Sequence, residues 1–129
     1  MSYKFVIDSY AWIEYFRGTE RGGIAKNYIE SKEAATSVIS LSELKEKYLR
    51  EGWDYFSSDL LFLTSVTTIV SVDKELATSA GQINFERKKM VKDWGMSDSI
   101  LLATAEKVSA KVVTGDAHFS DLKEVIMIK

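Results

Sequence analysis

Short apolar runs alternate with longer amphipathic stretches along this chain. The first run, Phe5–Ile7, contains no polar residue, which is typical of a strand buried on both faces of a parallel sheet. Runs at residues 35–39, 68–72 and 112–113 are rich in β-branched side chains and predict three more strands. A last apolar run at residues 125–128 is expected to form a short edge strand.

The stretches between these runs predict helices. After the first strand, Trp12, Ile13 and Phe16 fall on one stripe of a helix. Further helices are expected over residues 24–29, 40–50, 53–66, 74–90 and from residue 97 onward. Because residues 53–66 are strongly apolar, we expect this helix to lie in the core or at a subunit contact.

Strands separated by one or two helices are typical of a parallel sheet with helices on both faces. The 129 residues are enough for one domain with a substantial core. We therefore predict an α/β fold, a three-layer α/β/α sandwich with a central, mainly parallel sheet, in a single domain over residues 1–129. The last connection, over residues 114–125, is short for a crossover between parallel strands.

Composition limits the chemistry that the chain can support. It has no cysteine and one histidine, which excludes disulfides, thiolate metal sites and zinc sites built from several histidines of one chain. A bound metal must then be held mainly by oxygen, which favours Mg²⁺ or Mn²⁺. No apolar run approaches a membrane span and no secretory signal is visible, so we expect a cytoplasmic protein.

The formal net charge of −2 does not indicate a nucleic-acid-binding protein, but the cations are unevenly distributed. They form one tight group and one smaller group: Arg87, Lys88, Lys89 and Lys92, and Arg17 with Arg21. Such a group is either a solvated helix face or a contact for phosphates.

Four acids occupy equivalent places in the predicted fold. Asp8 and Asp116 follow the first and fourth strands, and Glu43 and Asp98 lie near the starts of helices. In an open α/β sheet these places meet at one edge. Because clustered carboxylates repel one another, such a group is suited to holding one or two Mg²⁺ or Mn²⁺ ions.

Each acid also has a purely structural interpretation. Asp8 is well placed as a helix N-cap, and Asp98 would favour the positive end of a helix dipole. The run from Ser40 to Glu43 fits a capping box, in which the glutamate bonds back to the serine amide. Asp116 would stabilise a turn. Any one of these interpretations is reasonable by itself, but four acids at equivalent places favour a functional group.

These acids stand within fragments that resemble the PIN-domain family, and most closely its VapC-like toxin ribonucleases. The fragments are Val6-Ile7-Asp8-Ser9, Ser42-Glu43-Leu44, residues 97–105 and residues 112–119. The resemblance covers nearly the whole chain and has the acids in the order of the family.

The resemblance implies Mg²⁺- or Mn²⁺-dependent cleavage of RNA, with Asp8, Glu43, Asp98 and Asp116 as the metal-binding acids. It implies that Thr114 supports these ligands from behind, and Asp121 is an alternative to Asp116 as the fourth ligand. His118 is expected to pack or to bond within its loop. The two basic groups would steer the RNA backbone.

The resemblance also implies partners. VapC-like toxins form homodimers and are held inactive by a small antitoxin, for which residues 53–63 would supply apolar surface. Two other functions stay open within the family: an RNA-maturation nuclease, and a catalytically silent module for RNA binding or assembly. A receiver-like signalling domain is a rival fold, but it would carry paired acids after the first strand and a lysine after the last.

Overall fold

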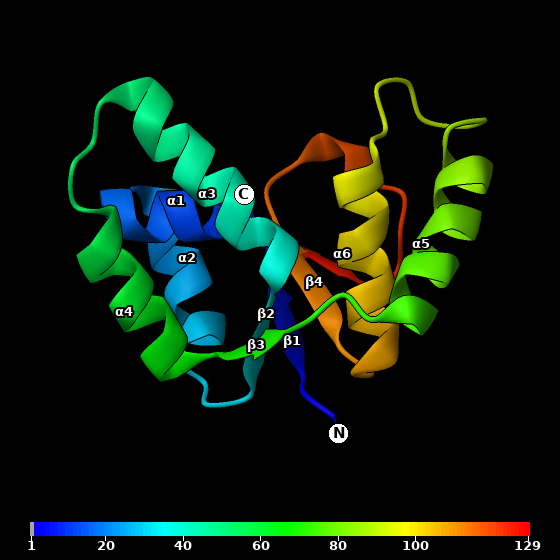
Figure 1. Ribbon diagram of the computed structural model, residues 1–129. Helices are drawn as coiled ribbons and strands as arrows, with labels where there is room; N and C mark the ends of the chain where they lie inside the picture. The colour runs from blue at the N-terminus through cyan, green and yellow to red at the C-terminus, as the bar shows by residue number, and fades with distance from the viewer. Residues whose placement is uncertain (1) are drawn as a thin grey trace.

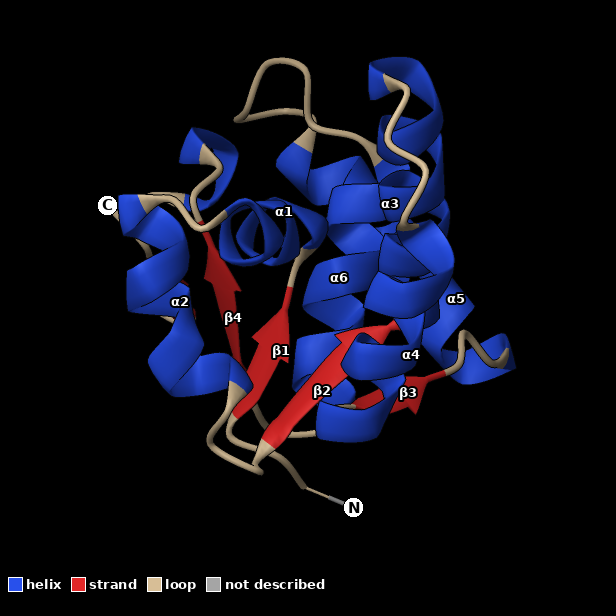
Figure 2. Cartoon of the chain, turned by 90° about the vertical axis from the view of Figure 1, so that its left-hand side faces the viewer, coloured by secondary structure: helices blue, strands red, loops and turns tan. Residues whose placement is uncertain are grey.

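The computed structural model describes residues 2–129, and its centre is one parallel sheet (Figure 1). The strands are β1 (Phe5–Ile7), β2 (Ala34–Ser37), β3 (Thr68–Val70), β4 (Lys111–Thr114) and β5 (Val125–Met127). They pair in the order β3-β2-β1-β4-β5, and each neighbouring pair is parallel. In Figure 2 the strands β4, β1 and β2 lie side by side and point the same way. The predicted parallel sheet, including its edge strand β5, is therefore confirmed.

Helices cover both faces of this sheet. They are α1 (Ser9–Arg17), α2 (Glu20–Ile29), α3 (Val38–Glu51), α4 (Phe56–Val66), α5 (Lys74–Arg87) and α6 (Met96–Lys107), with a short 3-10 turn η1 (Ala117–Phe119). Helices α1 to α4 pack on one face, and α5 and α6 pack on the other (Figure 1). The predicted three-layer sandwich is confirmed.

Alternate residues of the central strands enter the two layers of the core. In β1, Ile7 packs with α1 to α4, whereas Val6 packs with α6. In β4, Val113 and Val112 divide in the same way. All four side chains are fully buried. A strand with two buried faces needs apolar residues at every position, which explains the unbroken apolar runs of the sequence.

The second strand and the helix after it differ from the prediction. The strand ends at Ser37, and α3 begins at Val38 rather than at Ser40, because Ser37 is the N-cap and its hydroxyl accepts from the Ile39 amide. The β-branched Val38 and Ile39 had suggested a strand at these positions. Since Ser40 lies inside the helix, the capping-box interpretation of Ser40 and Glu43 is wrong.

Helix α4 is shorter and more exposed than its apolar sequence suggested. It begins at Phe56, and the preceding Trp53 and Tyr55 stack in the loop with ring centroids 6.3 Å apart. Only Leu63 of α4 is buried, whereas Leu61 and Phe62 are 73% and 37% exposed. Phe56 and Val66 pack against the core beside Leu63, whereas other apolar side chains of this helix lie on the surface.

Two other boundaries fall short of the prediction. Helix α5 ends at Arg87 instead of residue 90, and β3 ends at Val70 instead of residue 72. No helix within residues 2–129 is both long enough and apolar enough to cross a membrane.

Candidate active site

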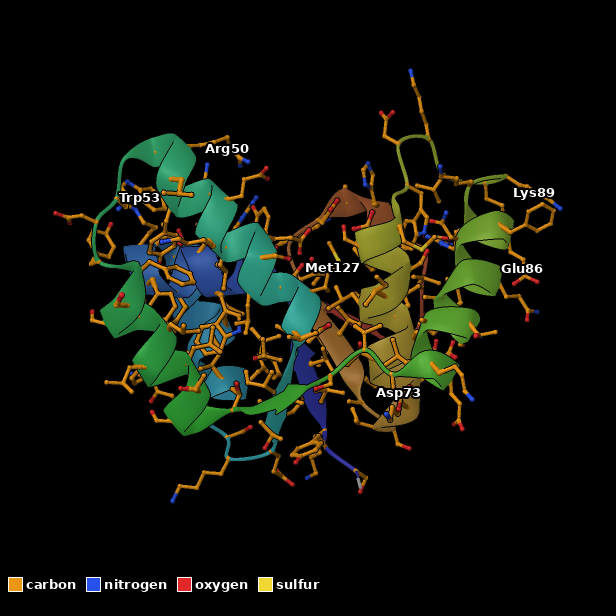
Figure 3. All side chains as sticks on the ribbon, in the orientation of Figure 1. Arg50, Trp53, Asp73, Glu86, Lys89 and Met127 are labelled. Atoms are coloured by element: carbon orange, nitrogen blue, oxygen red, sulfur yellow. The ribbon has the colours of Figure 1, made fainter. Side chains whose placement is uncertain are left out.

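The four predicted acids come together at the carboxyl edge of the sheet. Asp8, Glu43, Asp98 and Asp116 line one pocket of about 360 Å³ between α1, α3 and α6. In Figure 3, which has the orientation of Figure 1, side chains of α3 and α6 extend into the space between these two helices. Asp8 directly follows β1, and Asp116 lies two residues after β4. Glu43 is in the second turn of α3, and Asp98 is in the first turn of α6. Parallel strands thus bring residues 108 positions apart in the chain to one rim, as Asp8 and Asp116 are.

Asp8 is the most deeply buried of these acids. It is 5% exposed, its Oδ1 accepts from the Ala11 amide at 2.7 Å, and its carboxylate is also hydrogen-bonded by the Thr114 hydroxyl. The pKa of Asp8 is raised to about 7, mainly because the carboxyl is buried. The hydrogen bonds from Thr114 and Ala11 oppose this rise, and the neighbouring charges of Glu43 and Asp116 contribute to it. Asp8 is therefore both an N-cap and a wall of the pocket.

Asp98 and Asp116 also combine a cap with a place in the pocket. Asp98 accepts from the Gly95 amide at 3.0 Å through Oδ2, and Asp116 accepts from the His118 amide at 2.9 Å through Oδ1. The Asp116 amide in turn donates to the Thr114 hydroxyl at 2.9 Å. Each cap uses one carboxylate oxygen, so capping and ligand binding do not exclude each other at these positions.

Glu43 is held by two hydroxyls. The Ser9 hydroxyl donates to Oε1 at 3.2 Å, and the Ser97 hydroxyl forms a second hydrogen bond. Burial raises the pKa values of Glu43 and Asp98, and the charge of Asp116 adds to both effects. Sequence reasoning assigned no role to Ser9 and Ser97, although each directly neighbours one of the four acids in the sequence.

Tyr10 forms part of the pocket wall, which sequence reasoning also missed. Its ring lies so close to Gly115 that a β-carbon at residue 115 would overlap it. The Tyr10 hydroxyl accepts a hydrogen bond from the Arg21 guanidinium. Gly115 therefore allows the backbone after β4 to approach the ring.

The pocket contains more negative than positive charge. Lys47 is the one Lys or Arg that lines it in the described part of the chain, and its Nζ is paired with Glu51 Oε1 at 2.9 Å. Carboxylates and hydroxyls are the oxygen donors that Mg²⁺ and Mn²⁺ prefer, so the donor set fits a divalent cation. However, no three His, Asp or Glu side chains of residues 2–129 already form a metal-binding group. The pocket therefore has the type of donor atom that these ions prefer, but its side chains do not already form a closed coordination shell.

The predicted roles of Asp121 and Arg87 need correction. Asp121 does not line the pocket; its two carboxylate oxygens accept from Arg87 at 2.8 and 2.9 Å. Arg87 is 5% exposed and also donates to the His118 carbonyl at 3.0 Å. Because the guanidinium is buried and paired within the protein, Arg87 is not part of an exposed basic surface. The His118 amide donates to Asp116 Oδ1 within its own loop, as expected.

The other predicted phosphate contacts are on the surface. Lys88, Lys89 and Lys92 are exposed at the end of α5 and in the loop after it. Arg17 lies 4.2 Å from the centre of the Trp53 ring and donates to the Tyr55 hydroxyl at 2.7 Å, and Arg21 bonds Tyr10 at the pocket. None of these five cations forms a salt bridge with an acid of the described residues.

The parallel sheet with helices on both faces and an acidic pocket at its carboxyl edge is a PIN-like α/β fold. A family model for the PIN domain matches residues 5–125, which is nearly the whole chain. The chain belongs to the PIN domain family. No curated protein sequence matches it significantly.

Solved structures agree with this assignment. A chain of a toxin–antitoxin complex from Klebsiella pneumoniae is 20% identical, with a TM-score of 0.78 and 98% of both chains covered. VapC20 of Mycobacterium tuberculosis, described as a sarcin–ricin loop cleaving toxin, is 20% identical, with a TM-score of 0.75 and coverage of 93% of this chain and 95% of that one. A chain of DNA-bound VapBC from Salmonella typhimurium is 22% identical, with a TM-score of 0.69 and coverage of 97% and 96%. At these identities the similarity establishes the fold.

Proposed function

We propose that this protein is a metal-dependent endoribonuclease and the toxin of a toxin–antitoxin pair. The observation that carries the proposal is the pocket in which Asp8, Glu43, Asp98 and Asp116 meet. Within residues 2–129 no Lys or Arg pairs with these four acids, and the His118 imidazole lies 3.6 Å from Asp116. Similar folds in toxin–antitoxin complexes, and in a toxin described as cleaving the sarcin–ricin loop, support this function.

Asp8, Asp98 and Asp116 would hold a Mg²⁺ or Mn²⁺ ion. Such an ion lowers the pKa of water and stabilises negative charge that develops on a phosphate. Glu43, whose carboxylate is oriented by Ser9 and Ser97, would complete the coordination or orient the attacking water. Thr114 bonds both Asp8 and Asp116 and so holds these two acids relative to each other.

The RNA backbone would be bound by cations around this pocket. Arg21 is the best placed, because its hydrogen bond to Tyr10 fixes it at the pocket wall. Arg17, Lys88, Lys89 and Lys92 are exposed and supply further positive charge. We exclude Arg87 from this group because it is buried.

We further propose a protein antitoxin and a homodimer. A groove of about 600 Å³ is lined by Tyr15, Phe62 and Val66 together with polar residues, and the exposed Leu61 lies on the same helix as Phe62. This apolar surface would bind the antitoxin. Phe85, Met90 and Met96, at 67%, 68% and 49% exposure, would lie at the contact between two copies.

The test is cleavage of labelled RNA oligonucleotides by the purified protein with Mg²⁺, Mn²⁺ or EDTA. The variant Asp8→Asn retains a side-chain oxygen that can cap α1 but removes the charge. We expect cleavage that requires the ion and falls at least about a hundredfold in the variant, as when an essential electrostatic group is removed.

Other outcomes separate the alternatives. Equal cleavage with EDTA, or equal cleavage by Asp8→Asn, would contradict the proposal. A folded protein that binds RNA without cutting it would indicate the silent binding module. Cleavage limited to ends of a structured precursor RNA would instead favour an RNA-maturation nuclease.

A further inference from the structure

Arg87 is a buried cation for which the proposed reaction has no direct use. It ends α5, on the opposite face of the sheet from α1 and α3, and only 5% of its surface is exposed. Charged side chains are seldom buried unless they are paired, and a buried ion pair does not reliably add stability. Stability alone therefore does not explain why Arg87 is buried and paired.

The contacts of Arg87 converge on one short segment, residues 116–121. The guanidinium binds both carboxylate oxygens of Asp121, at 2.8 and 2.9 Å, and the carbonyl of His118 at 3.0 Å. It also lies 4.4 Å from the centre of the Trp94 ring, which packs against Phe119 with ring centroids 5.0 Å apart. The hydrogen bonds from Arg87 lower the pKa of Asp121, so the two groups are charged partners. We call Arg87, Trp94, His118 and Asp121 the Arg87 network.

This network holds the turn that carries Asp116. The His118 amide donates to Asp116 Oδ1 at 2.9 Å, and the Phe119 amide donates to the Asp116 carbonyl at 3.1 Å. The only regular structure of the segment is the three-residue turn η1. So short a turn has few hydrogen bonds of its own, and its position depends on contacts from outside. Figure 1 shows this turn and the end of α5 at the same upper edge of the molecule.

We propose that Arg87 is a positioning residue, which acts through the His118 backbone and Asp121 to hold the Asp116 carboxylate in the acidic pocket. This inference rests on the proposed function, because it takes the pocket to be a cation site. Residues behind a metal ligand orient it, and their mutation typically weakens metal binding about 10- to 100-fold. Arg87 would affect the pocket without contacting RNA or the ion.

A second ion pair in the protein provides a matched control. Lys107 pairs with Asp73, which caps α5, so this pair also joins α5 to a residue 34 positions away. It has no contact with the turn of Asp116, and its side chains are 45% and 48% exposed. Removing this pair therefore shows how the loss of any ion pair at α5 affects the protein, apart from an effect on the turn of Asp116.

The experiment compares Arg87→Met, Asp121→Asn and Lys107→Met with the wild-type protein by titration with Mn²⁺ alone. Asp121 is half exposed, so Asp121→Asn is expected to fold even where Arg87→Met does not. We expect the dissociation constant for Mn²⁺ to rise about 10- to 100-fold in Arg87→Met and about tenfold in Asp121→Asn. The constant of Lys107→Met should stay within about twofold of the wild-type value. Wild-type affinity in a folded Arg87→Met or in Asp121→Asn would overturn the proposal.

Amide hydrogen exchange separates this inference from the proposed function. In Asp121→Asn and Arg87→Met, the amides of His118, Phe119 and Ser120 should exchange at least about tenfold faster, while those of α1 and α3 keep wild-type rates. If the wild-type protein binds no Mn²⁺, the proposed cation site fails, and exchange alone decides whether Arg87 positions the turn. Unchanged exchange at these three amides would overturn the inference whatever the metal does.

Discussion

Asp8 and Asp73 cap different helices through similar hydrogen bonds but lie in opposite electrostatic surroundings. Asp8 accepts from the amide three residues on at 2.7 Å, and Asp73 does so at 2.8 Å. Asp8 is buried at the pocket, and burial raises its pKa to about 7. Asp73 is exposed at the start of α5, and its hydrogen bond from Lys107 lowers its pKa. The same capping motif thus holds two different carboxylates. Asp8 resists ionisation because it is buried, whereas Asp73 ionises readily because Lys107 pairs with it.

The acids around Asp8 and Asp73 differ in the same way. Burial raises the pKa values of Glu43 and Asp98 at the pocket, whereas pairing with Arg87 lowers that of Asp121. Ionised acids at the pocket therefore oppose folding until a cation binds them, whereas Asp73 and Asp121 are already paired with cations of the protein. A pocket that reduces stability is typical of a binding site, where ligand contacts replace the missing interactions.

The largest expected effect is a loss of stability with rising pH. Because the pKa of Asp8 is about 7 in the folded protein and 3.8 without burial, the folded state binds more protons between these values. Metal-free protein should lose on the order of 4 kcal/mol between about pH 4 and pH 7 through this group. Urea unfolding of wild-type protein and Asp8→Asn across this range measures the difference. If the free energy of unfolding changed with pH equally in the two proteins, burial would not raise the pKa of Asp8.

A divalent cation should reverse part of this loss. At a hundred times its dissociation constant, a ligand that binds only the folded state adds about 2.7 kcal/mol. Thermal unfolding with and without Mn²⁺ at about pH 7.5 tests this, with EDTA to reverse the effect. Asp8→Asn should show a much smaller shift, while Asp73→Asn should respond as the wild type does. If Mn²⁺ shifted the thermal midpoint of Asp8→Asn as much as that of the wild type, the pocket would not be the cation site.

Packing at the pocket wall gives a smaller effect. In Gly115→Ala the new β-carbon would overlap the Tyr10 ring, and such overpacking costs about 1–3 kcal/mol. Gly23→Ala is the matched control, because a β-carbon there meets no atom within 4 Å and residue 23 lies inside α2. The control should be stabilised by about 0.5–1 kcal/mol. Denaturant unfolding distinguishes them, and equal stabilities would show that the wall is not tightly packed.

The smallest effect is expected where an acid is exposed and paired. Lys107→Met removes the partner of Asp73, but both side chains are about half exposed. Exposed pairs add little, so the thermal midpoint should move by no more than about 2 °C. A shift as large as that of Gly115→Ala would mean that the α5 pair is much stronger than its exposure suggests.

The sequence alone predicted the strands and the acids of the pocket. Strands with two buried faces are uniformly apolar, so Phe5–Ile7 could be recognised without a structure. Asp8, Glu43, Asp98 and Asp116 were found because parallel topology brings the ends of the strands to one edge. The start of α3 was misplaced, since β-branched residues favour strands and the cap at Ser37 outweighed that preference.

Only the tertiary structure decided which charges are paired and which are not. Arg87 stands in a basic run of the sequence together with Lys88 and Lys89, yet Arg87 is buried against Asp121 and the two lysines are exposed. Likewise, neither Ser9 nor Tyr10 differs in the sequence from an ordinary helix residue. The local sequence pattern indicates which face of a helix or strand is apolar. Whether a charged side chain is buried and paired depends on residues more than thirty positions away, as for Arg87 and Asp121. The local sequence therefore showed that the acids lie at the ends of strands and the starts of helices. Their pKa values and their hydrogen-bond partners depend on the tertiary structure.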